Sequence, residues 1–192
     1  MQLLLATTNP GKISELSSLL PQTVEIVTPH SFPNASLPQV TEIGLTYFEN
    51  ALLKALRFYE TFRVPVLSDD SGLECDALQG DPGVRTSEYW KEKPWMDRWN
   101  QLNQDIEKAS NVRTARFQAV LCYYDGVLPH FYRGTLVGSI TQDTRGLGGF
   151  GYDPVFLIPS LGKTLAELEM SEKNSISHRA IAARAFIQAH LA

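Results

Sequence analysis

Short apolar runs alternate along the chain with segments in which apolar residues recur at helical spacing. The runs are as apolar as strands that are buried within a sheet, and the last two flank an Asp125-Gly126 pair, which is a strong signal for a hairpin turn. Strands are expected at residues 3–6, 24–27, 64–67, 114–124 and 129–140. The alternation predicts an α/β protein with a mixed sheet and flanking helices.

The predicted helices have recognisable starts. Asn9 and Pro10 suit the N-cap and the first position of a helix that follows the first strand. Thr46 and Glu49 form a capping box, in which the two side chains satisfy free backbone N–H groups. The apolar stripe of this second helix is expected to consist of Leu45, Phe48, Leu52, Leu56 and Tyr59. Further helices are expected over residues 94–108 and from about 175 to 191.

Length and charge bound the fold and the class of partner. A chain of 192 residues with 43% hydrophobic content can bury one core, so we expect one domain over residues 1–192, with room for two lobes that share a sheet. The formal net charge of -4 provides no general positive field, which argues against nucleic acid as a partner. A small anion in a local pocket is compatible with this charge.

The remaining composition points to an ordinary cytoplasmic protein. Cys75 and Cys122 lie in apolar, strand-like segments outside any CxxC pair, which favours buried structural thiols. The chain has no apolar stretch of 18 residues, and its start lacks the pattern of a signal peptide. We therefore expect a cytoplasmic location and no membrane partner.

Polar residues follow the first apolar run, where a loop leads into the helix capped by Asn9. The free N–H groups and the positive dipole end of such a helix suit a phosphate, and Lys12 adds a full charge. An ordinary capped helix with a solvated lysine explains the same segment. The candidate phosphate-binding residues are Thr7, Thr8, Asn9, Pro10, Gly11 and Lys12.

Two adjacent acids, Asp69 and Asp70, follow the third apolar run in a segment that we expect to leave the strand as a polar turn. Adjacent carboxylates repel unless a cation neutralises them, and hard oxygen ligands suit Mg²⁺. Because successive strand side chains point to opposite faces, the two acids are expected to serve differently, one at the metal or the attacking water and the other in support. The alternative is a turn whose side chains bond their own backbone.

Three more groups of residues are candidates for chemistry. Asn50 and Lys54 share a helix face opposite much of the expected apolar stripe, with Glu42 just upstream; a solvated helix face is the alternative. In residues 148–154, glycines permit close backbone approach and two aromatic side chains could sandwich a flat base, or else fill the core. Around the start of the last helix, Lys173, His178 and Arg179 place cationic groups where they oppose the helix dipole.

Together these ordered segments resemble the inosine triphosphate pyrophosphatase family, also called the Ham1-like family, over essentially the whole chain. The matching segments are residues 6–12, 48–55, 68–73, 80–84, 148–156 and 172–179. The resemblance implies an elongated α/β fold with two lobes around a nucleotide cleft, a homodimer and Mg²⁺ as cofactor. It implies hydrolysis of non-canonical purine nucleoside triphosphates, such as those of inosine and xanthosine, to the monophosphate and pyrophosphate.

The resemblance also assigns roles to residues. Asp70 matches the catalytic carboxylate and a metal ligand, with Glu42, or alternatively Thr41, as its partner at the metal. Asp69, Asn50 and Lys54 are taken as supporting residues. His178 and Arg179 would donate to a 6-oxo group, so the amino group of adenine would place donor against donor. The substrate-binding residues carried over are residues 7–12 with Ser71, Phe150, Gly151, Tyr152, Asp153, Lys173, His178 and Arg179.

The chain departs from the family pattern at two places. Thr8 stands where a glycine is usual, and Glu88 replaces a usual arginine, for which Arg85 is a candidate to compensate. Two other functions compete with the main prediction: a Maf-like enzyme that cleaves modified pyrimidine triphosphates, and a nucleotide-binding module without turnover. The segments at residues 150–153 and 177–179 argue against the first, and the acids with Lys12 and Lys173 argue against the second.

Overall fold

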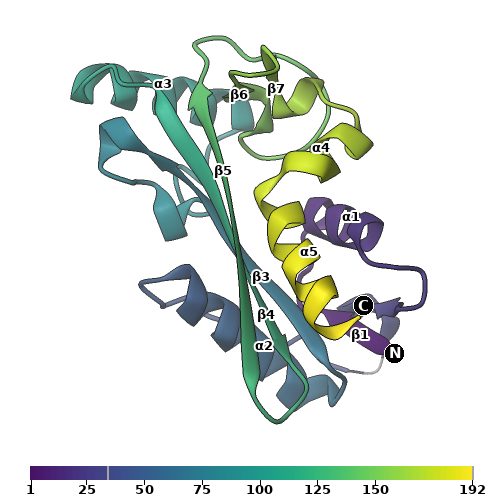
Figure 1. Ribbon diagram of the computed structural model, residues 1–192. Coiled ribbons are helices and arrows are strands. Elements are labelled where there is room, and N and C mark those ends of the chain that lie inside the picture. The colour runs from purple at the N-terminus through teal and green to yellow at the C-terminus, as the bar shows by residue number, and fades with distance from the viewer. Residues whose placement is uncertain (34, 192) are drawn as a thin grey trace. The chain divides into compact units, whose positions relative to one another are not determined.

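The computed structural model describes residues 1–33 and 35–191, and the chain folds as two compact units (Figure 1). Unit 1 consists of Met1–Asp70, Ala119–Gly134 and His178–Ala192, and unit 2 of Ser71–Gln118 and Thr135–Ser177. The expectations of one domain over residues 1–192 and of a cleft between two lobes remain predictions.

Within the described residues the strands form one sheet of seven, in the order β2-β1-β3-β4-β5-β6-β7. Strand β1 pairs in parallel with β2 and β3, whereas β6 pairs antiparallel with β5 and β7, so the predicted mixed sheet is confirmed. Strands β3, β4 and β5 contribute residues to both units. The bounds are β1 Gln2–Leu5, β2 Glu25–Val27, β3 Val66–Cys75, β4 Thr114–Tyr124, β5 Pro129–Ile140, β6 Phe156–Ile158 and β7 Lys163–Thr164.

The same residues form five α-helices and five short 3-10 helices. The α-helices are α1 Pro10–Leu19, α2 Tyr47–Phe62, α3 Trp95–Ala109, α4 Met170–Ile176 and α5 His178–His190. The 3-10 helices are Pro29–Ser31, Asp76–Leu78, Gly83–Arg85, Asp153–Val155 and Leu165–Glu167. No helix in the described part of the chain is long and apolar enough to cross a membrane.

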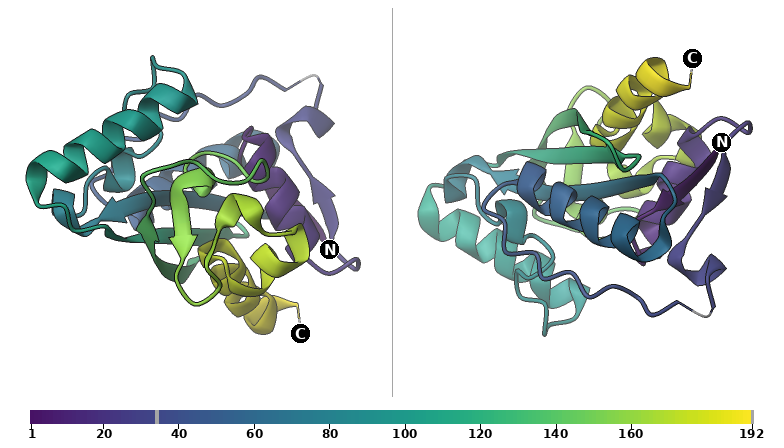
Figure 2. Two further views of the ribbon diagram at one scale, coloured as in Figure 1. Left: turned by 90° about the horizontal axis from the view of Figure 1, so that it is seen from above. Right: turned by 90° about the horizontal axis from the view of Figure 1, so that it is seen from below.

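In unit 1 the helices cover both faces of the sheet. Leu3 and Leu5 of β1 pack in one cluster with α1 and α5, and Leu4 packs in another with α2. This division follows from the alternation of side chains along a strand. Helices α1 and α5 lie side by side in Figure 1, and the right view of Figure 2 shows α2 along the neighbouring strands. The acid-bearing part of β3 therefore lies between two layers of helix.

Local signals set the starts of α1 and α2 as predicted. The Asn9 side chain accepts hydrogen bonds from the backbone N–H groups of Gly11 and Lys12, at 2.9 and 3.3 Å. Thr46 and Glu49 form the expected capping box. Both predicted helix starts are confirmed.

The predicted hairpin of β4 and β5 is also confirmed. These strands are neighbours in the sheet and are joined by residues 125–128, where Gly126 has φ +99° and the Val127 N–H donates to Asp125 Oδ1 at 2.9 Å. Further along β5, a Cβ at Gly134 would collide with the His178 carbonyl oxygen. A glycine at residue 134 is therefore needed for α5 to approach this strand.

Unit 2 has its own core, which contains Leu102 and Ile106 of α3, Leu73 and Cys75 of β3, and Tyr152. Cys75 is free and buried here, and Cys122 is free and buried in unit 1, as expected for structural thiols. Burial raises the pKa of each thiol to about 12, so the thiolate is scarce at neutral pH.

Three local predictions are wrong. The Ser68–Gly72 segment is not a turn, because β3 continues through it to Cys75; the cations around Asp69 and Asp70 let both acids remain in a buried strand. The last helix is divided at Ser177, so Lys173 lies in the last turn of α4 and not beside His178 in a first turn. The buried face of α2 is formed by Asn50, Ala51, Lys54, Ala55 and Phe58; Leu52 and Tyr59 of the predicted stripe pack against the core, whereas Leu45 and Phe48 are exposed.

Candidate active site

Asp69 is the centre of a buried ion cluster on the α1 and α5 side of β3. Its side chain lies 2.6 Å from Lys12 Nζ and 3.3 Å from a guanidinium nitrogen of Arg179, and Arg179 also binds Glu15 of α1. Burial disfavours the charged carboxyl, but Arg179 and Lys12 outweigh it and hold the pKa of Asp69 far below its usual range. Asp69 is therefore a permanent anion that fixes two cations.

Asp70 faces the opposite side of the strand, toward α2, as predicted for adjacent strand residues. Lys54 Nζ lies 2.7 Å from Asp70 Oδ1 and 3.4 Å from a carboxylate oxygen of Glu42. Burial raises the pKa of Asp70 to about 6, even though Lys54 pulls it down. A carboxyl poised near neutrality can take up and release a proton, as a general base must.

The two acids thus lie in different environments, and each is paired with its own lysine. Lys54 and Asn50, taken from sequence as a helix face opposite the apolar stripe, lie on the buried face of α2 instead. The Asn50 side chain accepts a hydrogen bond from the Gly44 N–H at 2.8 Å, which anchors the segment that carries Glu42. Of the two alternatives at the metal, Glu42 is the residue that reaches Lys54; the Thr41 side chain forms no hydrogen bond that the structure describes.

The ion pairs of Asp69 and those of Asp70, taken together as one cluster, balance closely in charge. They involve three cationic side chains, Lys12, Lys54 and Arg179, and four acidic ones, Glu15, Glu42, Asp69 and Asp70. Each cation is paired with at least one acid, so no excess positive charge is left for a polyphosphate.

The residues around Asp70 fit a metal ion that retains much of its water. Asp70 Oδ2 is buried and has no hydrogen-bond partner in the described residues, which leaves a lone-pair site for a ligand. Among the residues that the structure describes, no group of three or more His, Cys, Asp or Glu side chains could enclose an ion. Mg²⁺ commonly binds through one or two carboxylates, with substrate phosphate and water at its other positions.

The loop between β1 and α1 has fewer free donors than the sequence suggests. The Asn9 side chain already accepts from the N–H groups of Gly11 and Lys12. The Asn9 N–H itself donates to Thr7 Oγ1 at 3.1 Å. Thr8, Asn9 and Pro10 are exposed, and Thr7, Gly11 and Lys12 are half-buried. The predicted contact of this loop with phosphate stays a prediction.

In unit 2, Asp153 holds the glycine-rich turn. One of its carboxylate oxygens lies 2.5 Å from Lys173 Nζ and 2.8 Å from the Phe150 backbone nitrogen, and Lys173 Nζ is 5.1 Å from the centre of the Phe150 ring. Phe150 and Gly151 are half-buried. Tyr152, in contrast, packs in the core. Of the two alternatives for these aromatic residues, Tyr152 thus follows the one in which the ring fills the core.

The other predicted substrate residues are placed as follows. His178 and Arg179 are buried in the first turn of α5 in unit 1, and Arg179 is engaged by Asp69 and Glu15. Ser71 is a half-buried residue of β3 in unit 2. Their contacts with substrate remain predictions.

Sequence reasoning missed three participants. Glu15 looked like an ordinary helix residue, although its position three after Lys12 on α1 was a weak signal. Trp99 Nε1 donates to the Gly151 carbonyl at 2.9 Å, and buried Arg98 donates to the carbonyls of Thr86 and Ser87 at 3.2 Å. Arg98 thus contacts the segment in which Glu88 replaces the usual arginine, and compensation by Arg85 stays a prediction.

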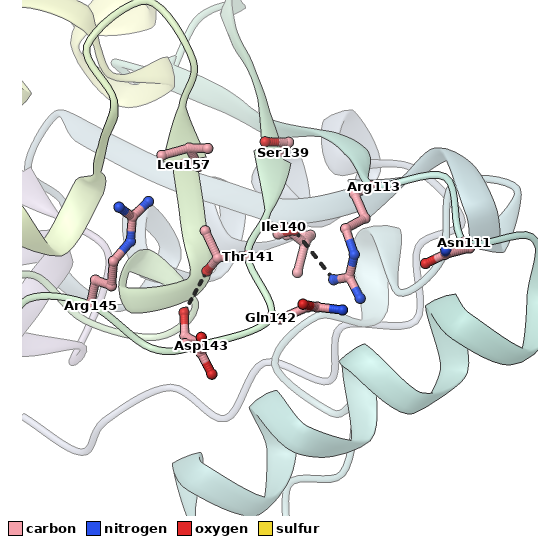
Figure 3. Close-up of a pocket in the computed structure, with 9 residues that line it drawn as sticks. All are labelled: Asn111, Arg113, Ser139, Ile140, Thr141, Gln142, Asp143, Arg145 and Leu157. Carbon is pink, nitrogen blue, oxygen red and sulfur yellow. Dashed lines mark hydrogen bonds between the residues drawn. The ribbon is translucent and has the colours of Figure 1, made fainter.

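Unit 2 also contains a pocket that is lined by other residues. Arg113 and Arg145 stand on opposite sides of it, with Thr141 and Gln142 between them (Figure 3). Arg113 is bonded to Glu107 at 3.0 Å, and Arg145 lies 3.8 Å from Glu167, so the pocket offers no unbalanced cation. None of the predicted site residues lines it.

The fold and the ion cluster define the class: a mixed α/β protein with two buried acids of unequal pKa, each held by its own lysine. The Ham1 family model matches residues 3–189, and the chain belongs to this family.

Curated relatives and solved structures agree with this membership. The chain is 42% identical to a dITP/XTP pyrophosphatase of an Exiguobacterium species, over 96% of this chain and 94% of the relative. It is 40% identical to the dITP/XTP pyrophosphatase of Escherichia coli K12, over 98% and 97% of the two chains. A HAM1 protein from Coxiella burnetii has a TM-score of 0.88 and 34% identity, with 98% of each chain covered.

Proposed function

We propose that this protein hydrolyses non-canonical purine nucleoside triphosphates, such as those of inosine, deoxyinosine and xanthosine, to the monophosphate and pyrophosphate. Family membership and the names of the curated relatives support the reaction class. The observation that carries the proposal is the geometry of β3, where Asp69 and Asp70 are each held by their own lysine, at 2.6 and 2.7 Å. The buried Asp70 Oδ2, which has no hydrogen-bond partner in the described residues, leaves room for a water molecule or a metal ion beside the acid.

Asp70 is the residue that we assign to the attacking water. Its free, buried oxygen is suited to orient a water molecule and to accept its proton, while Lys54 holds the other oxygen at 2.7 Å. Attack at the α-phosphorus breaks the bond to the bridging oxygen, and pyrophosphate leaves with the electron pair of that bond. Asp69 contributes indirectly, because it fixes Lys12 at the start of α1.

The cofactor that we propose is Mg²⁺, held by Asp70 with Glu42 as the second carboxylate. When bound, it supplies the positive charge that the balanced cluster lacks and polarises the phosphoryl group. Without it, about four negative charges of the triphosphate would meet lysines that are already paired with acids. This charge balance is the support for a metal requirement.

The turn at residues 150–153 is proposed to bind the base. Phe150 offers a half-buried ring, with Lys173 and Asp153 fixed beside it. His178 and Arg179 are assigned to the 6-oxo group, as the family resemblance implies, so a 6-amino purine is disfavoured. We also propose a homodimer and a cytoplasmic location, both of which rest on the family resemblance and the composition.

The reaction is tested with a panel of nucleoside triphosphates, with and without Mg²⁺, in which pyrophosphate and orthophosphate are measured separately. We expect inosine and xanthosine triphosphates to be cleaved at least 100-fold faster than ATP or CTP. For ATP the reason is that each protein donor that faces the 6-amino group is left unsatisfied, which costs about 1–3 kcal/mol. Removal of Mg²⁺ with a chelator should abolish turnover. Equal turnover of ATP, or release of orthophosphate alone, would contradict the proposal.

A further inference from the structure

The glycines of the turn that carries Phe150 do not fix its backbone. Gly149 and Gly151 have φ values of +68° and +66°, in the left-handed region that glycine enters at no steric cost. Glycine is equally free to adopt other conformations, so such a turn has a defined shape only where neighbouring groups hold it. The shape of this turn therefore depends on the hydrogen bonds that hold it, from Asp153 within it and from residues outside it.

Asp153 supplies the first anchor. Its carboxylate accepts from the Phe150 N–H at 2.8 Å and from Lys173 at 2.5 Å, and the Asp153 N–H donates back to the Phe150 carbonyl at 3.2 Å. These bonds fix the two ends of residues 150–153. They leave the peptide of Gly151, which lies between them, unheld.

Trp99 supplies the second anchor, at that peptide. Its indole N–H donates to the Gly151 carbonyl oxygen at 2.9 Å, across 52 residues of sequence. Trp99 is half-buried on α3, and α3 is itself secured by Leu102 and Ile106 in the core of unit 2. The donor is thus mounted on a rigid element, as the positioning of a binding turn requires.

The same helix also holds the ring that follows Gly151. Trp95 meets Tyr152 edge to face, with ring centroids 5.4 Å apart, and the Arg98 guanidinium lies 4.1 Å from the centre of the Trp95 ring. Trp95 and Trp99 are stacked at 6.3 Å. One face of α3 therefore contacts the turn at two successive residues.

We propose that Trp99 is a positioning residue for substrate selection: its N–H group fixes the Gly151 peptide and thereby the orientation of the Phe150 ring. This inference rests on the proposed function, in which that ring meets the purine base. Trp99 acts in this inference only through the Gly151 peptide, so its loss should change the binding and discrimination of bases more than the rate of the bound substrate.

The test is Trp99→Phe, which keeps an aromatic ring but removes the donor, with Trp90→Phe as the matched control. Trp90 contacts Tyr89, with ring centroids 6.4 Å apart, and not the turn. For Trp99→Phe we expect KM for inosine triphosphate to rise roughly three- to tenfold, the effect of one neutral hydrogen bond. The preference for inosine over adenosine triphosphate should fall by a similar factor, with kcat within about twofold of the unaltered protein.

Hydrogen exchange of the free protein gives a readout that does not depend on activity. We expect the amides of Phe150 and Asp153 to exchange several-fold faster in Trp99→Phe and to remain unchanged in Trp90→Phe. Unchanged exchange and KM in Trp99→Phe, or equal changes in both variants, would overturn the inference. If the unaltered protein fails to cleave inosine triphosphate, the proposed function fails, while the exchange data still decide whether Trp99 holds the turn.

Discussion

Replacement of Asp70 by asparagine is expected to lower turnover of inosine triphosphate roughly 1,000-fold or more, while the protein stays folded. The amide retains the size of the carboxyl and can still accept from Lys54, but it can neither take a proton from water nor bind a divalent cation as an anion does. Steady-state kinetics at pH 8 with saturating Mg²⁺ measure the loss. A variant that kept more than a tenth of the activity would remove Asp70 from the chemistry.

Stability measurements separate this effect from simple unfolding. Burial raises the folded-state pKa of Asp70 to about 6, above the usual aspartate value of about 3.9. A group shifted in this direction stabilises the fold below its unfolded pKa, and this contribution is lost as the pH rises through about 6. Asp70→Asn should therefore unfold at no lower temperature than the unaltered protein at pH 8.

The control for both assays is Asp143→Asn, because Asp143 is exposed and its side chain has no described bond. This variant should leave both turnover and the unfolding temperature unchanged.

In contrast to Asp70→Asn, Asp69→Asn should have its largest effect on the stability of the fold. The change leaves Lys12 and Arg179 without their shared buried anion, and removal of one partner from a buried ion pair costs about 3–5 kcal/mol. Urea unfolding at pH 7 measures the loss. The control is Glu60→Gln, which removes an exposed partner of Arg57 and should cost about 0.5 kcal/mol or less.

The pH dependence of that loss has a defined sign. The folded-state pKa of Asp69 is held well below the unfolded value of about 3.9, so its contribution is present above pH 4 and is lost as the pH falls through the folded pKa. The difference in unfolding free energy between Asp69→Asn and the unaltered protein should be constant between about pH 5 and 8 and should become smaller below about pH 4. If Asp69→Asn lost no more unfolding free energy at pH 7 than Glu60→Gln, this account of Asp69 would be contradicted.

The elements that sequence predicted well are those with local signals. The caps at Asn9 and Thr46 and the turn at Asp125-Gly126 depend on residues within a few positions of one another, and all three are found. The opposite orientation of Asp69 and Asp70 follows from the two-residue period of a strand, once both are placed in β3.

The errors arose where distant residues decide the local structure. A run of polar residues at 68–72 looks like the end of a strand, but Lys12, Lys54 and Arg179 reach it from three other segments and make its burial tolerable. The same pairing brings Lys54 onto the buried face of α2, against its hydropathy. The Trp99 contact with Gly151 spans 52 residues and has no signature in either local segment.

The central claim, that water attacks the α-phosphorus of a purine triphosphate, is tested most directly by hydrolysis in water enriched in oxygen-18. Products formed from inosine triphosphate would be read by phosphorus NMR, in which the heavy isotope shifts the signal of the atom that bears it. We predict that the label appears in the monophosphate and that the released pyrophosphate contains none. Label in pyrophosphate or in orthophosphate would contradict the account.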